Sequence, residues 1–251
     1  MTTRGVGPTA VCLENVTKSF GPKRVLDALT LEVPAGCGFV ILGRSGTGKS
    51  VTLKHIIGLV RPDSGRVVVH GEEISALSGA ALSSSRRKVG FLFQSAALFD
   101  SISVGENVAF PMRRHTAMTD REVREQARAK LEAVGLAEDY QKMPGELSGG
   151  MRKRAGLARA MALDPDLLLV DEPSAGLDPI TAEEIDGLLL KLKEQGTTLV
   201  IVTHNMASAR KLGDRLVMLH EGKAVAEGSV ADFERSGHDM VRAFMQSGHA
   251  G

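Results

Sequence analysis

Short runs made almost entirely of apolar residues recur along the chain. They lie at 39–42 (FVIL), 89–93 (VGFLF), 167–170 (LLLV) and 199–202 (LVIV). Such runs are typical of strands that are buried on both faces of a parallel sheet. Segments with helical periodicity follow two of them, and in the longer helix the residues predicted to face inward are Ile185, Leu188, Leu189 and Leu192. The alternation predicts an α/β fold with a mostly parallel sheet covered on both faces.

Strand-like segments also lie outside this alternation, at 11–20, 25–33 and 67–74. The segment RLVMLHEGKAVAEGS (215–229) predicts a hairpin that turns at Glu221 and Gly222. The last twenty or so residues predict one short helix with a frayed end.

Residues 95–160 have a helical pattern instead. Thr119 and Glu122 form a capping box, which predicts that a helix begins there. Gly135 stands where a helix C-cap belongs, and the apolar residues between them share one helix face: Val123, Ala127, Leu131 and Val134. The segment predicts a helical subdomain inserted into the α/β core.

Composition narrows the class of protein. The chain has 251 residues, 43% of them hydrophobic, which is enough for one large α/β domain with an insertion. Its 31 basic and 30 acidic residues nearly cancel, so we expect no nucleic-acid partner. Two cysteines, Cys12 and Cys37, without C-x-x-C spacing favour a reducing, cytosolic setting. The N-terminal residues lack a signal-peptide pattern, and no stretch reaches the ~18–20 apolar residues of a membrane span.

A phosphate-binding P-loop follows the first apolar run. The motif G-x-x-x-x-G-K-[ST] is matched by Gly43, Arg44, Ser45, Gly46, Thr47, Gly48, Lys49 and Ser50. Glycines let the backbone N–H groups surround a phosphate, and the N-terminus of the following helix adds partial positive charge. Lys49 is then expected to reach the β- and γ-phosphates of a nucleotide, and the Ser50 hydroxyl to ligate Mg²⁺.

Two acidic residues end the apolar run at 167–170. Asp171 is predicted at the carboxyl edge of the sheet, where it can join the Mg²⁺ shell. Glu172 can polarise an attacking water and accept its proton. The pair predicts nucleotide hydrolysis rather than binding alone.

Ser148, Gly149 and Gly150 begin the helix that follows Leu147, and this arrangement is typical of an anion site. The sequence LSGGM, placed between the P-loop and Asp171–Glu172, resembles the signature motif of ABC-type ATPases. That resemblance implies that two chains dimerise head-to-tail around two ATP molecules, each signature contacting the γ-phosphate held by the other chain.

The same resemblance covers essentially the whole chain and assigns four further positions. Gln94 resembles the Q-loop glutamine, which touches Mg²⁺ or water, and His204 the switch histidine, which grips the γ-phosphate and supports Glu172. Asp178 resembles the D-loop aspartate that crosses to the opposite P-loop. Phe20 matches the aromatic position that stacks on adenine, although it could simply belong to the core.

The resemblance implies a P-loop NTPase (RecA-like) core with an antiparallel β subdomain and an inserted ABC-type α-helical subdomain. The core comprises 1–94 and 161–228, the helical insert 95–160, and the C-terminal tail 229–251. The basic run 152–154 is interpreted as a solvated helix face.

Two positions depart from the commonest ABC pattern. Val51 follows the P-loop hydroxyl where many relatives have Thr or Ser, and Met151 replaces Gln, which would weaken one contact across the dimer. At both positions the chain resembles the ATP-binding subunits of Mla-type phospholipid transporters, which serve MCE-family lipid carriers. Residues 94–115 resemble the same branch. The resemblance implies a docking surface for an integral-membrane permease near residues 95–115. Its apolar members are Ala96, Ala97, Leu98, Phe99, Ile102 and Val104, which could instead pack only the core of the insert.

This branch implies two copies beneath a permease, on the cytoplasmic face of the inner membrane, with the MCE-domain carrier beyond it. A small accessory subunit, bound with help from the tail, is a further implied partner. The alternatives are the ATPase of an importer for a polar solute such as an amino acid, and an ABC ATPase serving DNA or ribosomes. The second usually carries a long coiled-coil insert, zinc motifs or a tandem cassette, and none of these is in the sequence.

Overall fold

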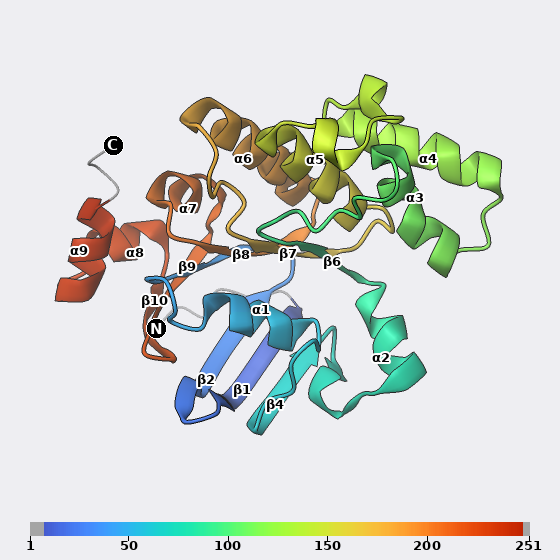
Figure 1. Cartoon of the computed structure of the whole chain (residues 1–251). Helices are drawn as coiled ribbons and strands as arrows, with labels where there is room; N and C mark the ends of the chain where they lie inside the picture. The colour runs from blue at the N-terminus through green and yellow to red at the C-terminus, as the bar shows by residue number, and fades with distance from the viewer. Residues whose placement is uncertain (1–7, 248–251) are drawn as a thin grey trace.

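The computed structural model describes residues 8–247. Residues 1–7, where the sequence predicts no signal peptide, and residues 248–251 of the predicted tail lie outside the described residues. Within residues 8–247 the larger sheet has six strands in the order β10-β9-β3-β8-β7-β6 (Figure 1). Its strands are β3 (Gly38–Leu42), β6 (Val89–Leu92), β7 (Leu167–Asp171), β8 (Thr198–Thr203), β9 (Arg215–His220) and β10 (Lys223–Gly228). All neighbours are parallel except β9 and β10, which form the predicted hairpin.

The larger sheet is buried on both faces, as the apolar runs predict. In β8, Leu199 and Ile201 pack into one hydrophobic cluster, and Val200 and Val202 into another on the opposite face. The helices over the first face are α5 (Gly149–Ala160), α6 (Pro179–Glu194) and α7 (Met206–Leu212) (Figure 1). Helix α1 (Lys49–Ile56) and a smaller sheet cover the second (Figure 1). The predicted α/β class is confirmed.

The smaller sheet is antiparallel, with the order β2-β1-β4-β5. Its strands are β1 (Thr9–Phe20), β2 (Lys23–Pro34), β4 (Ser64–Val69) and β5 (Glu72–Glu73). The prediction of one continuous strand over 67–74 is wrong. His70 and Gly71 both adopt positive φ, 50° and 78°, so the chain turns there and β5 pairs back onto β4. A 3₁₀ turn at Ile74–Ala76 and helix α2 (Gly79–Arg86) follow.

Helices α3 (Val104–His115) and α4 (Asp120–Ala133) form the predicted helical region together with α5. Short 3₁₀ turns at Ala137–Asp139 and Pro144–Glu146 connect α4 to α5. The capping box at Thr119 and Glu122 is present, and Leu131 is fully buried. These helices share a hydrophobic cluster with the larger sheet, so the division into core and insert stays a prediction.

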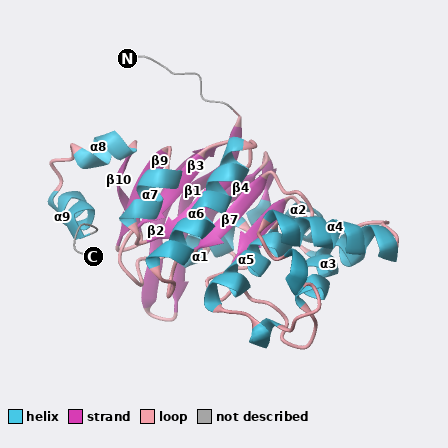
Figure 2. Ribbon diagram, turned by 90° about the horizontal axis from the view of Figure 1, so that it is seen from above, coloured by secondary structure: helices cyan, strands magenta, loops and turns pink. Residues whose placement is uncertain are grey.

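Residues 230–247 contain two short helices rather than the single one predicted, α8 (Val230–Glu234) and α9 (Asp239–Ser247). Ser229 caps the start of α8. Gly237 lies between the two helices, and glycine disfavours a helix interior, which is consistent with the break there. Figure 2 shows α8 and α9 beside β10, at the opposite end of the molecule from α3 and α4. Among the helices of residues 8–247, none is long and apolar enough to cross a membrane.

Two isoleucines allow a test of this core. Ile201 is fully buried in β8, whereas Ile180 on α6 is 76% exposed. Ile201→Ala should lower the free energy of unfolding by about 2–5 kcal/mol, because it removes buried methyl groups and leaves a cavity. Ile180→Ala should change it by less than about 0.5 kcal/mol. Urea unfolding followed by circular dichroism measures both, and equal losses would contradict the sheet position of Ile201.

Candidate nucleotide site

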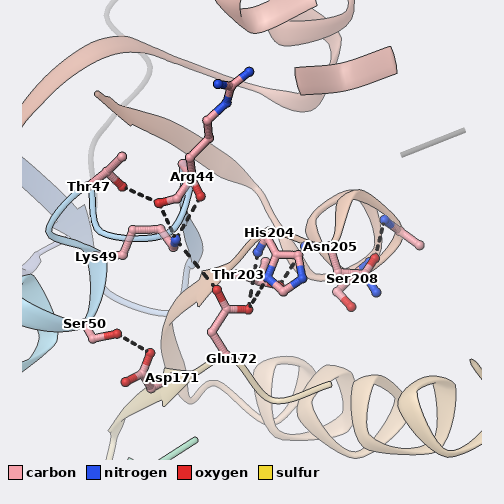
Figure 3. Close-up of polar contacts among 12 residues, drawn as sticks. Arg44, Thr47, Lys49, Ser50, Asp171, Glu172, Thr203, His204, Asn205 and Ser208 are labelled. Carbon is pink, nitrogen blue, oxygen red and sulfur yellow. Dashed lines mark hydrogen bonds and ion pairs between the residues drawn. The ribbon is translucent and has the colours of Figure 1, made fainter. Parts of the chain in front are cut away.

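A cleft of about 1110 Å³ lies at the carboxyl ends of β3, β7 and β8 (Figure 3). Its wall includes P-loop residues 43–46 and 48–50, together with Val51, Gln94, Glu172 and His204. Two glycines are required by close approaches of the backbone. A Cβ on Gly43 would lie 2.6 Å from the Leu219 carbonyl oxygen, and one on Gly48 would lie 2.8 Å from that of Val25. The sheet edge therefore collects predicted residues from four separate segments: the P-loop, Gln94, Glu172 and His204.

The Lys49 side chain lies inside the P-loop and hydrogen-bonds its main chain. Its ammonium donates to the carbonyl oxygens of Gly43 at 2.8 Å and Arg44 at 3.1 Å, and Thr47 Oγ1 donates to the Arg44 oxygen at 2.9 Å (Figure 3). Burial lowers the pKa of Lys49, an effect that the nearby carboxylates of Glu172 and Asp171 oppose. A loop wrapped around a buried cation is suited to hold the anionic phosphates of a nucleotide.

Ser50 and Asp171 meet behind the loop. The Ser50 hydroxyl donates to Asp171 Oδ1 at 2.8 Å, and Asp171 is 6% exposed (Figure 3). Burial raises the pKa of Asp171, while the Ser50 hydrogen bond lowers it. A hydroxyl and a carboxylate in contact are hard oxygen donors of the kind that Mg²⁺ binds. The donor set fits a magnesium ion, whose charge would offset the cost of burying this carboxylate.

Glu172 follows β7 and is held at the mouth of the cleft. Its Oε2 lies 2.9 Å from Nδ1 of His204, and its Oε1 lies 3.7 Å from the Lys49 ammonium (Figure 3). The main-chain N–H of Glu172 donates to the Val202 carbonyl at 2.9 Å. Its φ of 48° is a left-handed conformation that is uncommon for a residue with a side chain, and such outliers cluster at functional sites. The structure therefore places this carboxylate beside the P-loop.

Phe20 is placed differently. Of the described residues 8–247, the cleft wall includes Lys23 and Val25 of β2 but not Phe20. The Phe20 side chain is 49% exposed, and the Lys18 ammonium lies 5.6 Å from its ring centroid. It is therefore a surface residue on the hairpin next to the cleft, not a core residue.

The signature residues and Asp178 lie together, but away from this cleft. Ser148 caps α5 by accepting from the N–H of Met151 at 3.2 Å, and a Cβ on Gly150 would collide with Thr181 of α6. Asp178 caps α6, accepting from the N–H of Thr181 at 3.0 Å. The hydrogen bond from the Thr181 hydroxyl holds the pKa of Asp178 below its usual value. Within residues 8–247, neither Asp178 nor Ser148, Gly149 and Gly150 line the cleft.

The interpretation of residues 152–154 as a solvated face is wrong. Lys153 is only 5% exposed, and its ammonium donates to the carbonyl oxygen of Glu172 at 3.0 Å. Arg152 and Arg154 donate to the carbonyl oxygens of Leu147 and Val134. Lys153 comes three residues after buried Gly150 and four before buried Leu157, so helical spacing placed it on the buried face. The sequence contained that signal.

Helix α9 also reaches the cleft, which sequence reasoning missed. Met240, Ala243 and Phe244 line it together with Met206 and Met218. Their spacing of three and four residues along α9 indicates a single helix face. No motif marks this helix, so only the tertiary structure places it beside the P-loop.

A family model described as ABC transporter matches residues 26–175. The chain belongs to the ABC transporter family. A probable ribonucleotide transport ATP-binding protein, mkl, of Mycobacterium leprae is 44% identical over 96% of this chain and 70% of its own length. The intermembrane phospholipid transport ATP-binding protein MlaF of Haemophilus influenzae is 40% identical, covering 93% of this chain and 89% of its own. The dimeric ATP-binding cassette MJ0796, solved with ADP and Pi, superposes with a TM-score of 0.82 at 35% identity, covering 88% and 98% of the two chains.

These similarities identify the chain as an ABC-type ATPase that resembles MlaF. The P-loop, Asp171, Glu172 and His204 meet at one sheet edge, as expected for hydrolysis of ATP. Their individual roles remain predictions.

Lys49 provides a test of the P-loop. Lys49→Ala should weaken ATP binding by about 10- to 100-fold, because it removes the charged donor inside the loop that is expected to hold the phosphates. Equilibrium dialysis with labelled ATP measures the dissociation constant. Lys54→Ala is the matched control, because Lys54 is exposed on the same helix. Unchanged affinity in Lys49→Ala would remove this lysine from the phosphate site.

Proposed function

We propose that this ABC ATPase is the ATP-hydrolysing subunit of a transporter that moves phospholipid between the inner and outer membranes. The observation that carries the proposal is the similarity to MlaF over 93% of this chain and 89% of that relative. The E. coli relative of the same name is 39% identical, covering 94% of this chain and 88% of its own length.

A polar cargo is the second candidate. The relative named for ribonucleotide transport has the higher identity, 44%, but this chain spans only 70% of it. The motifs that resemble those of lipid transporters, LSGGM and the 94–115 segment, favour the phospholipid assignment. An importer of a polar solute stays the alternative, and the partner proteins distinguish the two.

For hydrolysis, we assign the phosphates of ATP to the P-loop N–H groups and Lys49, and Mg²⁺ to Ser50, Asp171 and Gln94. The metal, when bound, neutralises charge on the phosphates. Glu172 acts as general base, which its position beside His204 supports, at 2.9 Å between Oε2 and Nδ1. His204 is 66% exposed at its side chain, so it can reach a γ-phosphate while it orients Glu172.

Ser148, Gly149, Gly150 and Asp178 act in trans in this proposal. Within residues 8–247 these four do not line the cleft of their own chain, which supports a head-to-tail homodimer in which each copy completes the other's site. The similar cassette MJ0796 is dimeric in its solved structures. Phe20, exposed next to the cleft, is assigned to the adenine ring.

The permease is assigned to the surface around Phe99. Phe99 and Phe110 are each 48% exposed, and their ring centroids lie 5.2 Å apart, so together they form an apolar protrusion. Ala96 and Val104, two members of the predicted socket, are 2% and 0% exposed and pack the core instead. The docking surface is therefore narrower than the sequence predicts.

The remaining assignments follow from the phospholipid proposal. The homodimer would lie at the cytoplasmic face of the inner membrane, held there by the permease. An MCE-domain carrier would receive or deliver lipid through that permease. A small accessory subunit would bind near the C-terminal tail.

Replacement of Glu172 tests hydrolysis directly. Glu172→Gln keeps the shape of the side chain but removes its basicity, so kcat for ATP should fall by about 100- to 10,000-fold. ATP affinity, measured by equilibrium dialysis, should stay within about 2-fold of the wild type. Phosphate release by purified protein measures kcat. Near-normal turnover would remove Glu172 from the role of general base.

Phe99 tests the transport assignment. Tagged wild-type chain, recovered from native membranes in mild detergent, should carry a multi-span permease, an MCE-domain protein and phospholipid, identified by mass spectrometry. Phe99→Ser should lose the permease yet keep its isolated ATPase activity, because it removes exposed apolar surface remote from the cleft.

Met118→Ser, at another exposed apolar residue (44%), is the control and should retain the permease. A permease recovered with a solute-binding protein would favour the polar-solute alternative. No recovered membrane protein would contradict a transport function.

A further inference from the structure

The main chain of Glu172 is held at both ends of the residue. Its N–H donates to the Val202 carbonyl of β8 at 2.9 Å. Its carbonyl oxygen accepts from the Lys153 ammonium at 3.0 Å and from the N–H of Ala175 at 3.2 Å. Between these contacts the residue adopts its left-handed conformation, with φ of 48°. A conformation this uncommon persists only where the surroundings hold it, and Lys153 supplies a side-chain contact to this main chain.

Lys153 is unusual for a lysine. It is 5% exposed and lies on the buried face of α5, and its ammonium hydrogen-bonds a main-chain carbonyl rather than a carboxylate. Burial lowers its pKa, an effect opposed by the nearby charges of Asp171 and Glu172. Burying an ammonium costs free energy unless hydrogen bonds or opposite charges compensate it, so apolar packing alone does not explain the hydrogen bond from Lys153 to Glu172.

Helix α5 carries or contacts residues of three regions with proposed roles: the signature motif, Glu172 and the surface around Phe99. Its N-terminus carries Ser148, the start of the signature motif. Its middle holds Glu172 through Lys153. Near its C-terminal end, Arg159 donates to the Ala96 carbonyl at 3.3 Å and lies 5.9 Å from the Phe99 ring centroid.

We propose that Lys153 is a positioning residue that sets the direction of the Glu172 carboxylate and links it to the signature end of α5. The inference rests on the proposed function, in which Glu172 is the base and Ser148 contacts the nucleotide of the second copy. A shift of α5 when that nucleotide binds is passed through Lys153 to the Glu172 peptide. The hydrolytic carboxylate is thereby aligned only when the partner's nucleotide is in place.

The test compares Lys153→Met, which has similar length but no donor and no charge, with Lys153→Gln, which keeps a shorter donor. The Met variant should lower kcat for ATP by about 100-fold, because a small misplacement of a reacting group has such an effect. The kcat of the Gln variant should lie between that of the Met variant and that of the wild type. For both variants the ATP affinity, measured by equilibrium dialysis, should stay within about 2-fold of the wild-type value. Lys191→Met, at an exposed position on α6, is the control and should keep wild-type kcat.

A double variant separates positioning from general structure. In the Glu172→Gln background, Lys153→Met should cause no further fall in the residual rate, because the group that Lys153 positions no longer acts as base. A full additional 100-fold fall would overturn the proposal, as would wild-type kcat in Lys153→Met.

Three further outcomes are decisive. If Lys153→Met fails to fold, Lys153→Gln decides: lowered kcat with unchanged ATP affinity supports positioning, and wild-type kcat overturns it. Absence of ATP hydrolysis in the wild-type chain and its complex would instead contradict the proposed function. Normal wild-type hydrolysis that is lost in Glu172→Gln but kept in Lys153→Met would contradict this inference alone.

Discussion

Strands β3 and β7 both pair in parallel with β8, one on each side, and the candidate site depends on this arrangement. Leu42 pairs with Thr203, and Asp171 pairs with Val202, so the strands end at the same edge. The P-loop after β3 is thereby brought to Glu172 and His204, which lie more than a hundred positions further along the sequence. Because a parallel sheet must be covered on both faces, the edge is also the place where the backbone is open to a ligand.

The buried charges at this edge of the sheet compensate one another. Two buried lysines, Lys49 and Lys153, lie near two buried carboxylates, Asp171 and Glu172. Desolvation disfavours the charged forms of all such groups, and opposite charges nearby restore them. A nucleotide phosphate and a divalent cation would enter a site whose charges are already arranged in compensating pairs. This balance explains why so many ionisable groups can be buried in one small region.

Helix α5 connects that site to the rest of the molecule. It presents the signature residues at one end, contacts the Glu172 main chain in the middle, and holds residues 96–97 at the other end. A close approach of Gly156 to Ala96 leaves no space for a larger side chain, since a Cβ there would lie 2.9 Å from that of Ala96. The proposed dimer contact, the proposed general base Glu172 and the proposed permease surface are thus all contacted by one helix.

The sequence by itself determined the α/β class, the P-loop, the acidic strand end and the helix that begins at Thr119. These follow from local rules: apolar runs, glycine spacing and a capping box act within a few residues of each other. Tertiary structure decided the turn at His70 and Gly71, the second C-terminal helix, the hydrogen-bond partner of buried Lys153, and the approach of α9 to the cleft. The last two depend on which surfaces meet across long stretches of chain: helical spacing puts Lys153 on the buried face of α5, but it does not show that the ammonium meets the Glu172 carbonyl. The same reason explains why Ala96 and Val104 pack the core while Phe99 stays exposed.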